Sequence, residues 1–265
     1  MDSTSSIEKA GKNDSLLIDA AQLAGLLILE SGGETFRAEE TVVNFCLAGG
    51  CDSASAIAYP TGILMSVSLG SETYSSVKRI TRRGNDLVKL SRANDITRRF
   101  VKGQLTLENA YEELKEVSRA PGPSRLLKVL CSAATAAFFA VLFGGNLFDG
   151  AVAFVAGLLI QLVAFCFRHT GIYNFAVSFI GGAVIALLAV LGVTAFKMGS
   201  IEHIIIGATM PLLPGLMLTS AIRDAVMGDL MAGATRLVEA LLVAVAIASG
   251  VGIVLSAYIS MGGVL

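Results

Sequence analysis

The chain is poor in the residues that form metal sites and catalytic centres. Among its 265 residues there are two histidines, His169 and His203, and four cysteines that form no CxxC pair. The histidines are predicted to lie on opposite faces of a membrane and have no companions at ligand spacing, so we expect neither a metal site nor a cofactor. The cysteines, two of which lie in hydrophobic segments, are interpreted as packing residues. Those segments offer no intramembrane histidine and no Ser/His/Asp arrangement, which disfavours a membrane enzyme.

Charge is also scarce, and it is unevenly distributed. Charged residues make up 15% of the chain against 54% hydrophobic residues, and the mean hydropathy is +0.71. This composition is too apolar for an ordinary soluble protein. Residues 1–124 contain 14 of the 20 Lys/Arg and 16 of the 21 Asp/Glu. We therefore expect a disordered tail at 1–14, a cytoplasmic α+β domain at 15–124 and a transmembrane helical domain at 125–265, with a linker at Pro121-Gly-Pro123.

Five hydrophobic segments approach the roughly 20 apolar residues that a bilayer requires. They are residues 126–145, 150–167, 174–196, 201–222 and 237–259. An odd number of spans places the two termini on opposite sides. Arg125, Lys128, Arg168, His169, Arg223 and Arg236 lie in one set of loops and only Lys197 in the other. The positive-inside rule then predicts a cytoplasmic N-terminus and a C-terminus outside, and the first residues do not resemble a signal peptide.

The predicted cytoplasmic domain alternates helical and strand-like patterns. The hydrophobic spacing predicts helices at 16–31, 34–47, 85–102 and 107–117 and short strands at 57–59, 62–69 and 74–81. Residues 78–102 contain nine Lys/Arg against Asp86 and Asp95, a local excess of +7. We interpret this basic run as a surface that meets anionic lipid headgroups, while collection of an anionic substrate remains an alternative. Without an aromatic platform, nucleic-acid binding is disfavoured.

The fourth hydrophobic segment is interrupted by Pro211-Leu-Leu-Pro214-Gly215. Neither proline can donate a helix hydrogen bond, so the carbonyls of Gly207 and Met210 are predicted to lose their partners where no bulk water replaces them. Transporters place substrate at such broken helices. The helix that restarts near Pro214 would offer the amides of residues 215–217 to a carboxylate. The alternative is that the prolines only kink a packing helix.

Other polar residues complete the candidate site. With Pro211, Pro214 and Gly215, the candidates for substrate contact are Thr209, Thr219, Ser220 and Gln161. The hydroxyls could instead bond back to their own backbone, and the glutamine could hold helices together. The candidates for coupling or gating are Arg223, Asp224, Asp229, Arg236 and Glu239. Glu239 follows Arg236 by three residues, the spacing of a local ion pair, or it could carry a proton.

Small residues recur at four-residue spacing in the hydrophobic segments, as at Ala153 and Gly157 and at Ala246 and Gly250. A Gly181-Gly182 pair lies in another span. Such residues let helices approach closely, either within the bundle or with a partner.

Two stretches resemble the signatures of the threonine/serine exporter (ThrE) family and its split YjjP-like members. The first is Glu30-Ser-Gly-Gly-Glu34-Thr-Phe-Arg37-Ala-Glu39-Glu40-Thr-Val, and the second runs from Leu213-Pro214-Gly215 through Arg223-Asp224 and Gly228-Asp229 to Gly233. The resemblance covers residues 15–260 and marks Glu34, Arg37, Glu39 and Glu40 as a cytoplasmic signature. It implies an exporter in a bacterial inner membrane.

The resemblance also implies that the chain is the larger half of a split transporter. Its partner would be a small YjjB-like membrane subunit, in a hetero-oligomer that could be homo-oligomeric as well. The expected function is proton-coupled export of small carboxylate-bearing solutes, either threonine and serine or succinate-like dicarboxylates. The alternative is a membrane-tethered ligand sensor or regulatory subunit. The broken fourth span argues against it, because an anchor gains nothing from interrupted helix bonds.

Overall fold

The computed structural model describes residues 3–80, 84–167 and 174–263. Its elements pack into two compact units. Unit 1 comprises Met1–Gly122 and Leu216–Leu237, and unit 2 comprises Pro123–Gly215 and Val238–Leu265. The division after Gly122 falls within the expected linker, but Leu216–Leu237 packs with unit 1 although it lies in the range expected to be transmembrane. Four residues of the predicted charge patterns lie outside the described residues: Arg82, Arg83, Arg168 and His169.

Unit 1 contains a three-stranded sheet and several helices, as the patterns predict. The elements of its first part are α1 (Ser3–Glu30), α2 (Thr35–Ala48), β1 (Ser53–Tyr59), β2 (Gly62–Leu69), β3 (Glu72–Arg79), α3 (Leu87–Val101) and α4 (Leu107–Arg119). The expected helices and strands are present within a few residues of their expected bounds, apart from the start of the first helix. Helix α1 is described from Ser3 and so includes most of the range expected to be a disordered tail. Its polar residues extend a helix whose later turns are fixed by packing, and elongating an existing helix costs far less than nucleating one.

The sheet of unit 1 is an antiparallel meander in the order β1-β2-β3. Tyr59 pairs with Gly62 and Leu69 with Glu72, so each connection is a two-residue turn. Side chains alternate between faces along a strand. Ile63, Met65 and Val67 are therefore buried on the inner face.

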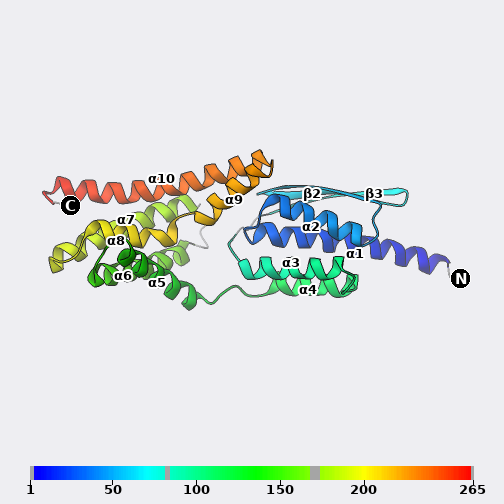
Figure 1. Ribbon diagram of the computed structural model, residues 1–265, viewed down its shortest axis with the longest axis horizontal. Coiled ribbons are helices and arrows are strands. Elements are labelled where there is room, and N and C mark those ends of the chain that lie inside the picture. Colours follow the sequence, from blue (N-terminus) through cyan, green and yellow to red (C-terminus); the bar gives the residue numbers. More distant parts are fainter. Residues whose placement is uncertain (1–2, 81–83, 168–173, 264–265) are drawn as a thin grey trace. The chain divides into compact units, whose positions relative to one another are not determined.

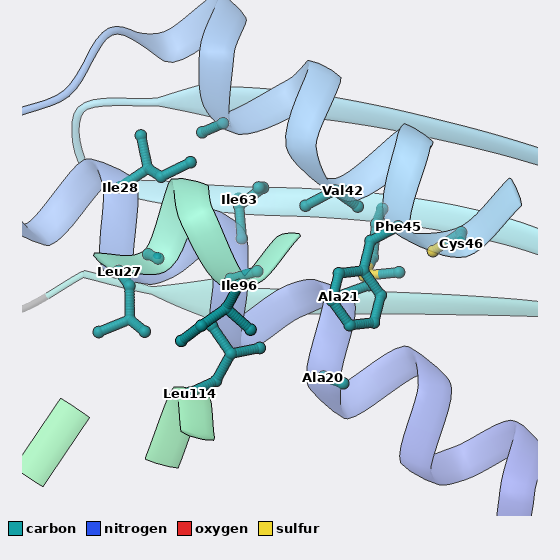
Figure 2. Close-up of a cluster of buried hydrophobic side chains, with 14 of the residues drawn as sticks. Ala20, Ala21, Leu27, Ile28, Val42, Phe45, Cys46, Ile63, Ile96 and Leu114 are labelled. Atoms are coloured by element: carbon teal, nitrogen blue, oxygen red, sulfur yellow. The ribbon is translucent and has the colours of Figure 1, made fainter. Parts of the chain in front are cut away.

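The core of unit 1 lies between the sheet and its helices. In Figure 1 the sheet, the α1/α2 pair and the α3/α4 pair of this unit form successive layers. Figure 2 shows Val42 and Phe45 of α2 reaching toward Ile63 of β2, Ile96 of α3 and Leu114 of α4. These side chains are almost completely buried. Burying apolar area of this kind is the main stabilising term of the unit.

Unit 2 is helical throughout its described part and very apolar. Its helices are α5 (Arg125–Leu142), α6 (Leu147–Phe167), α7 (Asn174–Phe196), α8 (Ile201–Thr209) and the later part of α10 (Leu230–Ser260). Four helices of the described chain are long and apolar enough to cross a membrane: α5, α6, α7 and α10. A fifth span is obtained if α8 and the turn after it are joined with α9 (Gly215–Val226) across the break. Helices of this length and apolar composition meet what a bilayer requires of spanning segments.

Small residues allow close helix contacts inside unit 2. A Cβ atom on Gly157 of α6 would collide with backbone of Ala133 in α5, and one on Gly182 of α7 would collide with backbone of Ile247 in α10. Gly250 lies equally close to the Phe179 backbone. The sequence allowed these small residues to serve contacts either within the bundle or with a partner. The structure uses these glycines within the bundle, where small side chains let membrane helices pack closely.

Candidate functional site

The break in the fourth hydrophobic segment is built from a tight turn. Helix α8 is followed by a 3-10 turn (η1, Met210–Leu212), and Leu213 is extended with φ −62° and ψ 134° before α9 begins at Gly215. The amide of Met210 donates to Gly207, and the amide of Leu213 donates to Met210 at 3.3 Å. The expectation that these two carbonyls lose their partners is therefore wrong. Contraction to i→i+3 bonding supplies the donors that the prolines cannot.

The start of α9 retains part of the predicted arrangement. The Gly215 amide is engaged by the Leu213 carbonyl at 2.9 Å. Across the described residues no backbone acceptor is recorded for the next two amides, Leu216 and Met217. A Cβ atom on Gly215 would meet no other atom within 4 Å. The predicted carboxylate site at this helix start therefore has two amides to offer, those of Leu216 and Met217, instead of three.

The hydroxyl groups near the break bond to their own helices. Thr209 donates to Ile206 O at 2.9 Å, and Thr219 donates to Leu216 O at 3.0 Å. This is the alternative that the sequence left open for them. Ser220 and Gln161 are half-buried, the latter in α6. Pro211 and Pro214 belong to unit 2 and Thr219 and Ser220 to unit 1, so substrate contact by all these residues stays a prediction.

The first signature stretch and residues 223–233 of the second meet inside unit 1. The first forms the corner between α1 and α2, where Gly32 has φ +88° and Gly33 donates to Ile28 O at 2.8 Å. This is the glycine-dependent end of a helix, and a Cβ atom on Gly33 would also collide with Ile28 and Leu90. The corner aims the carbonyl of Gly33 and the amide of Thr35 in the direction of the second signature.

Asp224 of α9 is the centre of this contact. Its side chain is fully buried, its Oδ1 accepts from the Thr35 amide at 3.1 Å, and its Oδ2 lies 3.2 Å from Arg236 Nε. Arg236, only 7% exposed, also donates through Nη2 to the Gly33 carbonyl at 2.7 Å. A carboxylate at the N-terminus of α2, paired with a buried guanidinium, is favoured by the helix dipole and by charge-assisted hydrogen bonding.

Asp229 joins the same contact from the turn between α9 and α10. Its Oδ1 caps α10 by accepting from the Ala232 amide at 3.0 Å, while its Oδ2 accepts from the Thr35 hydroxyl at 2.7 Å. The turn requires Gly228, whose φ is +96°. One carboxylate therefore both starts a helix and anchors it to the first signature.

Glu34 and Glu39 extend the cluster toward its more exposed side. Glu34 forms ion pairs with Arg223 of α9 and, at 3.2 Å, with Arg37 of its own helix. Glu39 Oε1 accepts from the Ala58 amide at 2.7 Å, which ties α2 to β1. Burial raises the pKa of the Glu39 carboxyl, and the negative charges of Asp229 and Asp224 raise it further.

The structure thus brings together seven of the predicted residues from two separate predictions. They are Glu34, Arg37, Glu39, Arg223, Asp224, Asp229 and Arg236. Glu40 is exposed on α2. The recorded partners of Arg236 are Asp224 and Gly33, and the local pair of Arg236 with Glu239 stays a prediction. Thr35 was quoted within the signature without a role, although it supplies both an amide and a hydroxyl to the cluster.

Asp149 at the start of α6 is a further polar residue that the sequence argument missed. It is 1% exposed, and its Oδ2 accepts from the Asn146 amide at 2.8 Å while Asn146 Oδ1 accepts from the Asp149 amide at 2.9 Å. Its Oδ1 accepts from the Ser200 amide at 2.8 Å, which fixes the loop before α8. The Asn-x-x-Asp spacing before an apolar run resembles a capping box and was the available signal. Within the described ranges no group of three or more His, Cys, Asp and Glu side chains is placed to hold a metal ion.

Comparison with known proteins gives one match. The model of the ThrE family, described as "Putative threonine/serine exporter", matches residues 19–258 of the chain. Neither a curated protein nor a solved structure matches it. The matched range includes both signature stretches and, except for the last two residues of α10, every described membrane-span candidate.

Proposed function

The chain belongs to the ThrE family, and from this premise we propose that it is the larger subunit of a secondary exporter. The solutes would be small and carboxylate-bearing, either threonine and serine or succinate-like dicarboxylates, and export would be coupled to protons. A transporter family also fits the expectation that the chain is not an enzyme. In this proposal unit 1 is cytoplasmic, the C-terminus is outside, and the membrane is a bacterial inner membrane.

The observation that carries the proposal is the break between α8 and α9. Leu213 is extended there, and the amides of Leu216 and Met217 point out of a new helix start without a recorded backbone acceptor in the described chain. A helix start with free amides favours a carboxylate. Substrate would therefore bind at Pro214 and the first turn of α9, where transporters with broken helices hold their substrates.

The polar cluster that the two signatures form in unit 1 is proposed to couple this unit to transport. Arg223, Asp224, Asp229 and Arg236 all lie within Leu216–Leu237, which directly follows the break. Because Asp224 and Asp229 are bound to the start of α2, α9 as a rigid helix would have to move α2 or break these bonds when it moves. Glu239 is the candidate proton carrier and Asp224 a comparable one, as carboxyl groups at partly buried depth.

A small YjjB-like membrane subunit is proposed as partner. Four or five spans are few for a transport pathway, and exposed apolar side chains such as Phe138 and Leu142 of α5 remain on the surface of unit 2. A hetero-oligomer, with or without further copies of the same chain, would complete the pathway.

Efflux from cells tests the proposal. Cells that express the chain with its genomic neighbour should lose labelled threonine, serine or succinate faster than cells without it. Pro214→Ala should abolish this difference, because the restored amide donor favours a continuous helix and withdraws the free helix start. The protein should still insert, which membrane fractionation checks.

Gly252→Ala is the matched control, because a Cβ atom at Gly252 meets no atom within 4 Å and the position lies far along α10 from the break. Normal efflux with Pro214→Ala would contradict the proposed site. Unchanged accumulation of all three solutes in every strain would favour a membrane-tethered sensor.

A further inference from the structure

Unit 2 contains a cavity of about 560 Å³ that the proposed function does not use. It lies where the last turns of α7 and α10 meet the first turn of α8. Five aliphatic side chains line it, together with Gly199, Ser200 and Glu202. The aliphatic residues are Val193, Ile201, Ile205, Ile206 and Leu255.

Glu202 gives this cavity its chemical character. It is the one ionisable residue among the described residues that line the cavity. A carboxylate beside an aliphatic wall attracts a cation with a small apolar body and repels a carboxylate, so a bound amino acid would turn its ammonium group toward Glu202 and its own carboxylate away from it. The wall is also fixed in place, because the Ser200 amide is held by the buried carboxylate of Asp149.

We infer that this cavity binds the ammonium group of a small amino acid through Glu202. The inference rests on the proposed export function and narrows it, because a dicarboxylate has no group that Glu202 would attract. Threonine and serine carry both an ammonium group and a small aliphatic body with a hydroxyl. The cavity would hold such a solute beside the first turn of α8, at the end of that helix away from the Pro214 break.

Binding of labelled L-threonine to the full chain in phosphatidylglycerol nanodiscs tests the inference. Threoninol, which keeps the ammonium group, should compete in the wild type and compete less in Glu202→Gln. β-Hydroxybutyrate and succinate lack that group and could act only at the Pro214 break, so any competition by them should be the same in both. Glu202→Gln should weaken threonine binding by about ten- to a hundredfold, the range expected for a lost charged hydrogen bond. The threonine affinity of Glu202→Asp should lie between that of the wild type and that of Glu202→Gln.

Two further variants separate the cavity from general damage. Val193→Phe places a ring in the cavity and should also weaken binding, whereas Leu191→Phe, on the exposed side of the same helix and outside the lining, should not. Expression and melting temperature of each variant, measured in the same nanodiscs, report folding.

The ammonium group of a phosphatidylethanolamine headgroup has the same chemistry, so nanodiscs containing that lipid form a second arm. If threonine binds more weakly in nanodiscs that contain this lipid, and if Glu202→Gln removes that difference, then the lipid headgroup competes with threonine at the inferred site. If Glu202→Gln changes the binding of this lipid but not the binding of threonine, the amino-acid assignment would be overturned.

Equal threonine affinity of wild type and Glu202→Gln, in a chain that still supports efflux, would overturn the inference and leave the exporter proposal intact. A wild-type chain that neither binds nor exports threonine, serine or succinate would overturn both.

Discussion

Removal of Asp224 should destabilise the protein strongly. Asp224→Ala leaves the buried Arg236 guanidinium with the Gly33 carbonyl as its recorded partner, and it takes the carboxylate away from the Thr35 amide. Breaking one side of a buried ion pair costs about 3–5 kcal/mol. For a chain of this size, each kcal/mol shifts the melting temperature by about 2–4 °C, so we expect a decrease of roughly 6–20 °C.

Arg223→Ala is the matched comparison on the exposed side of the cluster. The Arg223 side chain is 54% exposed, and its partner Glu34 keeps Arg37 when Arg223 is removed. A pair of this kind contributes about 0–1 kcal/mol, which corresponds to less than about 4 °C. Both variants can be followed by far-UV circular dichroism during heating in one detergent.

The double variant Asp224→Ala with Arg236→Leu completes this test. Removing both charges takes away the uncompensated buried guanidinium, so the double variant should melt above Asp224→Ala alone. Equal shifts for Asp224→Ala and Arg223→Ala, or no recovery in the double variant, would refute the view that the buried pair holds the two signatures together.

Three further predictions concern packing, pH dependence and thiol reactivity. Gly207→Ala should lower stability by about 1–3 kcal/mol, because the added Cβ would collide with the Ala140 backbone, whereas Gly252→Ala, in open space, should not; equal melting temperatures would contradict this. Burial raises the pKa of Glu39 in the folded state, so its contribution to stability falls as the pH rises from the ordinary glutamate range to the raised value; Glu39→Gln should raise the melting temperature at pH ~7 but not at pH ~4, and a gain that is independent of pH would be inconsistent with this. Burial raises the pKa of Cys46 to about 12, so peptide mapping after maleimide treatment of the folded protein near neutral pH should find this thiol unmodified.

The kinds of secondary structure and their approximate positions follow from the sequence alone. Alternation in β2 and the helical spacing of α2 are local patterns, and each is visible within a few residues. The long apolar segments that form α6, α7 and α10 likewise indicate candidate membrane spans without any tertiary information. The resemblance of two stretches to family signatures was also readable, because a signature is a property of consecutive residues.

The tertiary structure decided which of these residues meet. Thr35 and Asp224 are 189 positions apart, so no local pattern shows that the second signature anchors its carboxylates on the first. Only packing shows that Leu216–Leu237 belongs with unit 1 and that Gly157 and Gly250 serve contacts within the chain.

The backbone near the two prolines shows the same division between sequence and tertiary structure within a few residues. The sequence determined which donors are missing, because proline has no N–H. It did not determine that η1 would contract and satisfy the Gly207 and Met210 carbonyls from other amides. Composition states which groups must find partners, but the choice of partner depends on the whole set of competing contacts, which exists only in the folded chain.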